Sequence, residues 1–141
     1  MWNEIKKEED IQKLLILFNN FHDSCIRDIY ISTREYVDKN LAMHFDNILT
    51  ASVIFQSQYA NQTVLELKFE ELIDFNFRHF GKTENSVIYD AKLIYLNGLF
   101  YWADFIDWEI GDNDSTWISG KKLFWRLRPD LIGNINRLLD N

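Results

Sequence analysis

The feature that most constrains the fold is the alternation of apolar and polar side chains through the middle of the chain. Residues 65–70 alternate leucine or phenylalanine with glutamate or lysine, the pattern of a strand with one buried and one solvated face. Similar runs cover residues 25–31, 49–56, 73–78, 87–96, 99–108 and 121–127. Asn97-Gly98 suits the two-residue turn of a β-hairpin. Because strands adjacent in sequence usually pair, these runs predict a mainly antiparallel, meander-like sheet.

A helical period precedes the strands and predicts a helix over residues 8–19. The apolar residues of this segment form one stripe: Ile11, Leu14, Leu15 and Phe18. Acidic residues occupy its first turn, and Asn19-Asn20 tolerates the left-handed conformation that ends helices. Pro129 suits the first turn of a short C-terminal helix. The predicted class is therefore α+β, with the N-terminal helix packed on the sheet.

Chain length, the small number of prolines and glycines, and the cysteine content constrain the domain organisation of the chain. The 141 residues include one proline and five glycines and show no internal repeat, so we expect residues 1–141 to form a single α+β domain. A single cysteine excludes an intrachain disulfide and suits a reducing compartment. The first residues lack the apolar segment of a signal peptide, and no apolar run reaches the ~20 residues that span a bilayer. The expected location is cytoplasmic.

The net charge of −7 limits the classes of partner. A negative surface repels the phosphates of nucleic acids and of anionic membranes, so neither is expected as a partner. A basic protein would be attracted to the chain and steered toward it. The alternative is that the charge only keeps an aromatic-rich protein soluble.

The segment that follows the predicted helix contains residues with catalytic potential. His22 and Asp23 resemble the ligand pair of His-Asp phosphohydrolases, but such a metal site needs further ligands on helices, and the two other histidines fall in strand-like stretches. Cys25 is disfavoured as a nucleophile with His22 as its base, because residues an odd number apart point to opposite faces of a strand. We expect Cys25 to be a small core residue.

We predict instead that His22, Asp23 and Ser24 form a structural latch between helix and sheet. In this interpretation the Asp23 carboxylate accepts bonds from nearby backbone N–H groups and the imidazole bridges loop carbonyls. The sequence also lacks a glycine-rich phosphate loop and a His-Glu-x-x-His helix. No catalytic residue, metal or cofactor is predicted.

The late hairpin and the loop that follows it combine large aromatic side chains with carboxylates. Tryptophan and tyrosine dominate interface energies, and carboxylates steer basic partners. The predicted partner-binding residues are Tyr101, Trp102, Asp104, Asp107, Trp108, Glu109, Asp112, Asp114 and Trp117. The alternative is that the tryptophans are ordinary core residues and the acids a solvated loop. A calcium loop over residues 112–123 is disfavoured, because Leu123 stands where the bidentate glutamate is required.

The order of several motifs resembles that of a family of small uncharacterised bacterial proteins. These motifs are Trp2-Asn3-Glu4-Ile5, Phe21-His22-Asp23-Ser24, Phe55-Gln56-x-Gln58, Tyr101-Trp102-Ala103-Asp104 and Trp125-Arg126. This resemblance covers nearly the whole chain and brings no catalytic residue with it. The first quarter is also similar to the start of certain immunity proteins of bacterial polymorphic toxin systems. That second resemblance implies a binding protein that neutralises a cognate toxin.

Three functions remain open from the sequence. The first is a non-enzymatic protein-binding domain, most concretely an immunity protein, with a basic protein as partner. The second is a housekeeping binding domain without a toxin. The third is a small-ligand protein or metal-dependent enzyme centred on His22 and Asp23, which would require a pocket lined by both residues and a further histidine.

Overall fold

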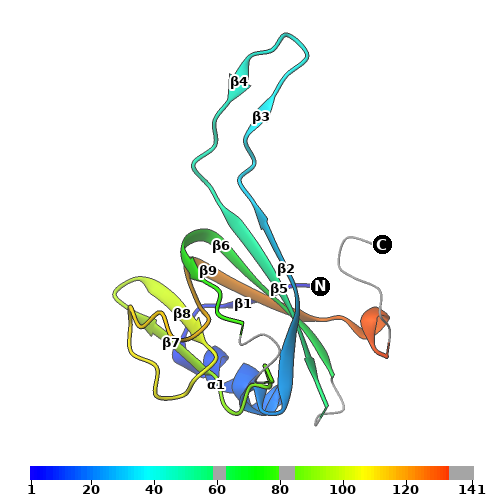
Figure 1. Ribbon diagram of the computed structural model, residues 1–141, viewed down its shortest axis with the longest axis vertical. Coiled ribbons are helices and arrows are strands. Elements are labelled where there is room, and N and C mark those ends of the chain that lie inside the picture. Colours follow the sequence, from blue (N-terminus) through cyan, green and yellow to red (C-terminus); the bar gives the residue numbers. More distant parts are fainter. Residues whose placement is uncertain (59–62, 80–84, 134–141) are drawn as a thin grey trace.

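The computed structural model describes residues 1–58, 63–79 and 85–133, and a large antiparallel sheet dominates them (Figure 1). The elements in chain order are β1 (Asn3–Ile5), α1 (Glu8–Leu17), the 3₁₀ turn η1 (Asn19–Phe21), β2 (Ser24–Ser32), β3 (Tyr36–Val37), β4 (Met43–His44), β5 (Thr50–Ser57), β6 (Val64–Asn76), β7 (Lys92–Leu96), β8 (Leu99–Ala103), β9 (Trp117–Leu127) and the 3₁₀ turn η2 (Pro129–Leu131). The predicted α+β class with an antiparallel sheet is confirmed.

The seven-stranded sheet has the order β2-β5-β6-β9-β8-β7, with β1 also paired to β9. Neighbours in sequence pair within β5-β6 and within β7-β8-β9, as a meander requires. Between these two parts the chain leaves β6, crosses to the far edge of the sheet and begins β7 there. Strand β9 consequently lies in the middle, with β6 along one side and both β8 and β1 along the other.

Several strands differ from the predicted ranges. Residues 65–70 and 73–78 were expected as two strands, whereas β6 continues through both with an irregularity between Leu72 and Asp74. Residues 87–91 form only an isolated bridge, between Ile88 and Ser24, and the chain after Ala103 forms a loop. These differences arise because the alternating pattern reports burial, which loops also provide when they cover a sheet.

Helix α1 packs its apolar stripe on one face of the sheet. Ile11, Leu14 and Phe18 are fully buried, while Leu15 is half-buried at the edge of the same core. The Asp10 carboxylate accepts the backbone N–H groups of Lys6 and Lys7 and so satisfies donors before the first turn. The helix ends where the Asn19-Asn20 signal predicts, and both asparagines have positive φ.

The other face of the sheet is covered in part by η2. Leu131 packs there against Ile54 and Val64. Nearby, the buried Glu66 carboxylate pairs with Arg126 and Arg128 at 2.8 and 2.9 Å. Pro129 therefore begins a helical turn as predicted, and the remainder of the predicted C-terminal helix lies outside the described residues. None of the described helices has the length and apolar character needed to cross a membrane.

Between β2 and β5 the chain projects from the body as a narrow hairpin, which we call the arm (residues 33–49). Strands β3 and β4 pair within it and are separate from the main sheet. Figure 1 shows the arm extending along the long axis of the molecule, away from α1 and from the loop after β8. Sequence patterns did not indicate this projection.

Candidate functional site

The predicted partner-binding residues divide into a buried aromatic set and an exposed acidic set. Trp102 lies in the main core in ring contact with Phe21 and Phe55, and Trp108 and Trp117 pack on each other with Tyr101 beside them. The three tryptophans are buried, so the prediction that they serve as exposed anchors is wrong. A strand with apolar residues on both faces can be covered on both, and this is the case for β8.

The buried tryptophans support the loop that carries the acids. Trp108 Nε1 donates to the carbonyl of Asp112 at 2.9 Å, and Trp117 Nε1 donates to the side-chain oxygen of Asn113 at 3.0 Å. The Asp112 carboxylate accepts the backbone N–H of Asp114 at 2.9 Å, and Lys92 Nζ donates to the carbonyl of Trp108 at 2.8 Å. The two buried tryptophan side chains thus hold the loop that carries the carboxylates in place.

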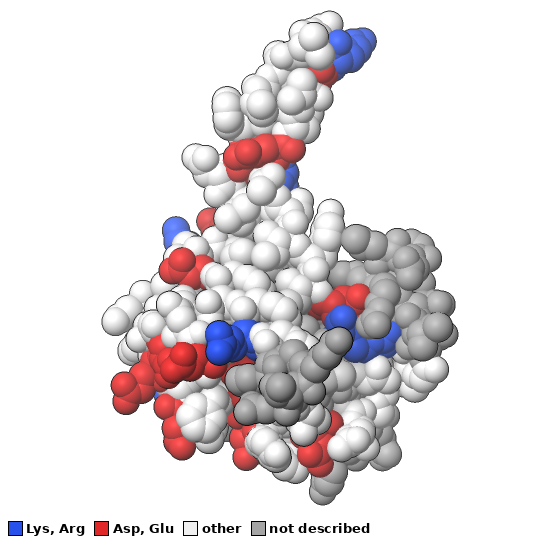
Figure 2. Space-filling model, in the orientation of Figure 1, with Lys and Arg blue, Asp and Glu red and all other residues white. Residues whose placement is uncertain are grey.

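Residues 104–114 make this loop strongly acidic. Asp107, Glu109, Asp112 and Asp114 are exposed, Asp104 is half-buried, and the loop contains no lysine or arginine. Figure 2 shows Asp and Glu side chains gathered on the side of the molecule where Figure 1 places this loop. The five carboxylates predicted to steer a partner are therefore held in one segment of the surface.

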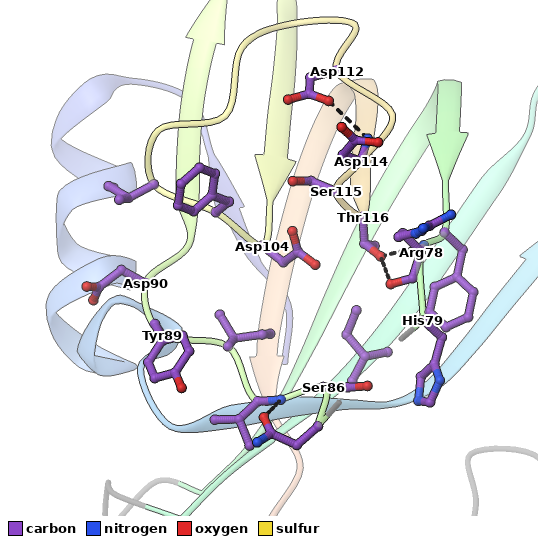
Figure 3. A pocket seen from close by; sticks show the side chains of 17 residues that line it. Arg78, His79, Ser86, Tyr89, Asp90, Asp104, Asp112, Asp114, Ser115 and Thr116 are labelled. Atoms are coloured by element: carbon purple, nitrogen blue, oxygen red, sulfur yellow. Dashed lines mark hydrogen bonds between the residues drawn. The ribbon is translucent and has the colours of Figure 1, made fainter. Parts of the chain in front are cut away.

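A cavity of about 900 Å³ lies beneath this loop, and Figure 3 shows the side chains that line it. One wall comes from the acidic loop and the following residues up to Thr116. The other walls come from residues 77–79, which follow β6, from residues 85–90 of the crossing connection and from Ile26 of β2. Apolar side chains from all three segments line the space together with polar groups, so the cavity suits a ligand group with an apolar stem and a charged end.

Four aspartates line the cavity, and Asp104 is the half-buried one whose burial shifts its pKa (Figure 3). Burial raises the pKa of Asp104, while hydrogen bonds from the Thr116 backbone and the Ser115 side chain act in the opposite direction. The backbone N–H of Asp104 also donates to the Thr116 carbonyl at 3.0 Å. This carboxyl group is held by its neighbours and incompletely solvated, which favours a cationic group beside it.

The wall opposite Asp104 is tied to β9 through a threonine. The backbone N–H of Arg78 donates to Thr116 Oγ1 at 2.8 Å, and that hydroxyl donates to the Arg78 carbonyl at 3.2 Å. Asn76 Nδ2 donates to the carbonyls of Asn113 and Ser115 at 3.1 and 2.7 Å. The side chains of Thr116 and Asn76 therefore join the end of β6 and the residues after it to the acidic loop.

Residues 22–24 hold a different wall of the cavity. His22 Nδ1 donates to the carbonyl of Tyr89, and the backbone of Ser24 and Asp23 exchanges bonds of 2.8 and 2.9 Å with Ile88. Ser24 Oγ donates to the carbonyl of Phe21. These contacts fasten residues 88–90 to the turn between helix and sheet.

One detail of the latch prediction is wrong. The Asp23 carboxylate was expected to accept backbone N–H groups, but it lies 3.3 Å from His22 Nε2. The main chain of Asp23 makes the backbone bonds instead: its N–H donates to the Ile88 carbonyl, and its carbonyl accepts the Gln58 N–H. Asp23 and Phe21 both have positive φ, a conformation uncommon for bulky residues, and Phe21 is fully buried among aromatic rings. The turn therefore keeps a strained backbone conformation, because the Phe21 side chain fills the core.

The geometry that an enzyme centred on His22 and Asp23 would require is not found at this cavity. Within the described residues, the cavity lining includes His79 but neither His22 nor Asp23, and no group of three metal-ligating side chains gathers anywhere in that part of the chain.

Cys25 is exposed on β2, so its prediction as a core residue is wrong.

The arm and the cavity are the two features that sequence reasoning missed. One residue that could have pointed to the turn of the arm is Asp38, whose side chain can close a turn directly after Tyr36-Val37. The cavity has no local signal, because its walls lie far apart in the sequence.

Comparisons with family models, with curated proteins and with solved structures found no match for this chain.

Proposed function

We propose that this chain is a non-enzymatic protein-binding domain that receives a basic partner at the acidic loop and the cavity beneath it. The observation that carries the proposal is the position of Asp104 inside an open cavity, under a loop with four exposed carboxylates and no basic residue. A lysine or arginine side chain of a partner would place its apolar stem along the cavity walls and its charged end beside Asp104.

Two properties of the loop support this role. Its carboxylates are of one sign, so they raise the rate of encounter with a positively charged surface. Its backbone is already fixed by Trp108, Trp117 and Asn76, so little conformational entropy is lost when a partner orders it further. A fixed acidic surface favours specific association over loose attraction.

The apolar contacts come from residues other than those expected. Phe105, Ile106 and Ile110 are half-exposed within the same loop, and the first two line the cavity. They would supply the water-excluding contacts that the sequence assigned to the tryptophans. The partner surface would therefore combine basic residues with a small apolar area.

The most concrete form of this function is toxin neutralisation by an immunity protein. The similarity of Phe21-His22-Asp23-Ser24 to the first segment of such proteins supports it, and in this chain that segment braces one wall of the cavity. Under this proposal a basic toxin domain is the partner. A housekeeping binding domain with a different basic partner uses the same surface.

A binding assay against the product of a neighbouring toxin gene tests the proposal. We expect the association rate to fall as ionic strength rises, because screening weakens charge steering. The double variant Asp112→Lys, Asp114→Lys should bind the partner more weakly. The matched double variant Glu8→Lys, Glu9→Lys on α1, outside the cavity lining, should have a much smaller effect. An association rate that ignores salt would contradict the electrostatic part. Unchanged affinity of the loop variant would contradict the site.

A further inference from the structure

The tip of the arm is a built turn. The Asp38 carboxylate accepts the backbone N–H groups of Asn40 and Ala42 at 2.8 and 3.1 Å and the imidazole N–H of His44 at 2.8 Å. The His44 ring also stacks on Tyr36, with centroids 4.6 Å apart. Nearer the body, Arg34 pairs with Asp46 at 3.2 Å. One face of the arm is thus occupied by its own polar contacts.

The other face of the arm is apolar and lies in solvent. Val37 and Met43 are cross-strand partners, and Phe45 follows Met43 on the same side of β4 by alternation. Their exposed fractions are 53%, 56% and 77%, and Leu41 at the tip is 86% exposed. Six of the twenty exposed large apolar residues in the described part of the chain lie in the arm. Such a concentration marks an interaction surface.

The arm carries charges of both signs and would hold the bodies of two contacting copies apart. Residues 33–49 contain two basic and three acidic side chains, so the arm contributes −1 to the net charge of −7. The rest of the chain carries −6 and repels a second copy of itself. Because the arm projects away from the body (Figure 1), a contact between arms keeps these like charges apart.

Two charges near the ends of the apolar face are arranged in a self-complementary way. Glu35 lies two residues before Val37, toward the body, and is placed on the apolar face by alternation. Lys39 lies at the tip, next to the exposed Leu41. A two-fold axis through the middle of the apolar face brings the tip of one arm to the base of the other, which sets Lys39 opposite Glu35 twice.

We propose that the apolar face of the arm packs against the same face of a second copy of this chain, antiparallel and about a two-fold axis. Val37, Met43 and Phe45 form the centre of the contact, and Glu35 and Lys39 pair across it. The centre of the contact has three side chains per partner, far fewer than the roughly 20–30 residues a side of a standard interface, so the dimer is weak and depends on concentration. The acidic loop takes no part, and either proposal can therefore fail alone.

Sedimentation equilibrium of the full chain, over a concentration series up to about 1 mM, tests for the dimer. We expect the mass to rise toward that of two chains. The double change Met43→Ser with Phe45→Ser should give a monomer throughout, with an unchanged circular dichroism spectrum. Ile16→Ser, which removes an equally exposed side chain from α1 (80% exposed), should associate as the unaltered chain does. A monomer at every concentration, or an arm variant that still dimerises, overturns the proposal.

A charge exchange tests the antiparallel arrangement. Glu35→Lys alone, or Lys39→Glu alone, turns two attractions into two repulsions and should raise the dissociation constant about tenfold. The double variant Glu35→Lys with Lys39→Glu restores opposite charges and should regain the affinity of the unaltered chain. Failure of the double variant to regain affinity, when each single variant has lost it, overturns the proposed pairing.

Discussion

The hairpin of β7 and β8 and the hairpin of the arm have the same local architecture in different surroundings. Each is an antiparallel pair with apolar cross-strand partners, Leu93 with Trp102 in the first and Val37 with Met43 in the second. Leu93 and Trp102 are buried beneath the rest of the body, whereas Val37 and Met43 are more than half exposed. The difference lies in what covers them, not in how they are built.

This contrast separates two uses of apolar surface. In the body, burial of the hairpin contributes to folding stability and leaves nothing for a partner to contact. In the arm, the same kind of side chain contributes little to folding, because a two-stranded hairpin buries little by itself. Its apolar surface remains free for association, and its shape is maintained by polar contacts at the tip.

Truncation of one large side chain in each hairpin should give the largest difference. Trp102→Ala removes a fully buried ring from the core and should lower the free energy of unfolding by about 3–5 kcal/mol. Phe45→Ala in the arm should change it by less than about 0.5 kcal/mol. Urea titration at a dilute protein concentration measures both. A loss of 2 kcal/mol or more at Phe45 would show that the arm is covered by its own chain.

His22 of the latch and His44 of the arm provide a smaller contrast. His22→Ala removes the bond to the Tyr89 carbonyl and should destabilise the fold by about 1 kcal/mol. His44→Ala removes the ring that stacks on Tyr36 and bonds Asp38, and should leave the main unfolding transition in place while the arm becomes more mobile. Thermal unfolding and amide exchange within residues 36–44 distinguish them. Equal losses of melting temperature would contradict the separation of arm from body.

Two aspartates should give the smallest effects, with opposite signs. Burial raises the pKa of Asp104, so its ionised form disfavours folding, and Asp104→Asn should raise the melting temperature at pH 7. The gain should vanish below the ordinary aspartate pKa of about 3.9, where both states are protonated. A melting temperature that falls in Asp104→Asn at pH 7 would show that the charge is stabilised by the cavity.

Asp38 should behave in the reverse manner. Hydrogen bonds from His44 and from the backbone of Ala42 lower the pKa of Asp38, so its ionised form stabilises the turn. Its contribution is present above about pH 3.9 and is lost as the pH falls through the lowered pKa of the folded turn. Asp38→Asn should therefore speed amide exchange at Asn40 and Ala42 at pH 7. Identical exchange at pH 7 in the variant would contradict this account.

The sequence predicted the elements whose structure is determined by near neighbours. The Asn97-Gly98 turn needs two residues with positive φ, and both have it. The stripe of α1 follows from helical spacing alone. The turn of the arm escaped prediction because it depends on one side chain, Asp38, that bonds several groups at once, and the adjacent strands are only two residues long.

The candidate site was predicted for its charges and missed for its shape. Carboxylates stay in solvent in most folds, so Asp107, Glu109, Asp112 and Asp114 were placed correctly on the surface. A tryptophan in a strand can face a core or a partner, and local pattern cannot decide between them. The cavity depends on the path from β6 to β7, which brings residues 85–90 over the sheet, and no short-range signal encodes that path.

The central place of β9 in the sheet has a consequence for biosynthesis. Strand β9 pairs with β6, with β8 and with β1, which begins at residue 3, so these three strands lack their common neighbour until residues 117–127 have left the ribosome. Until then the nascent chain carries unpaired strand edges and uncovered core residues, the surfaces that chaperones recognise and that promote aggregation. The sheet therefore closes only after β9 has been synthesised, and a ribosome stalled before Trp117 would hold a chain that cannot close it.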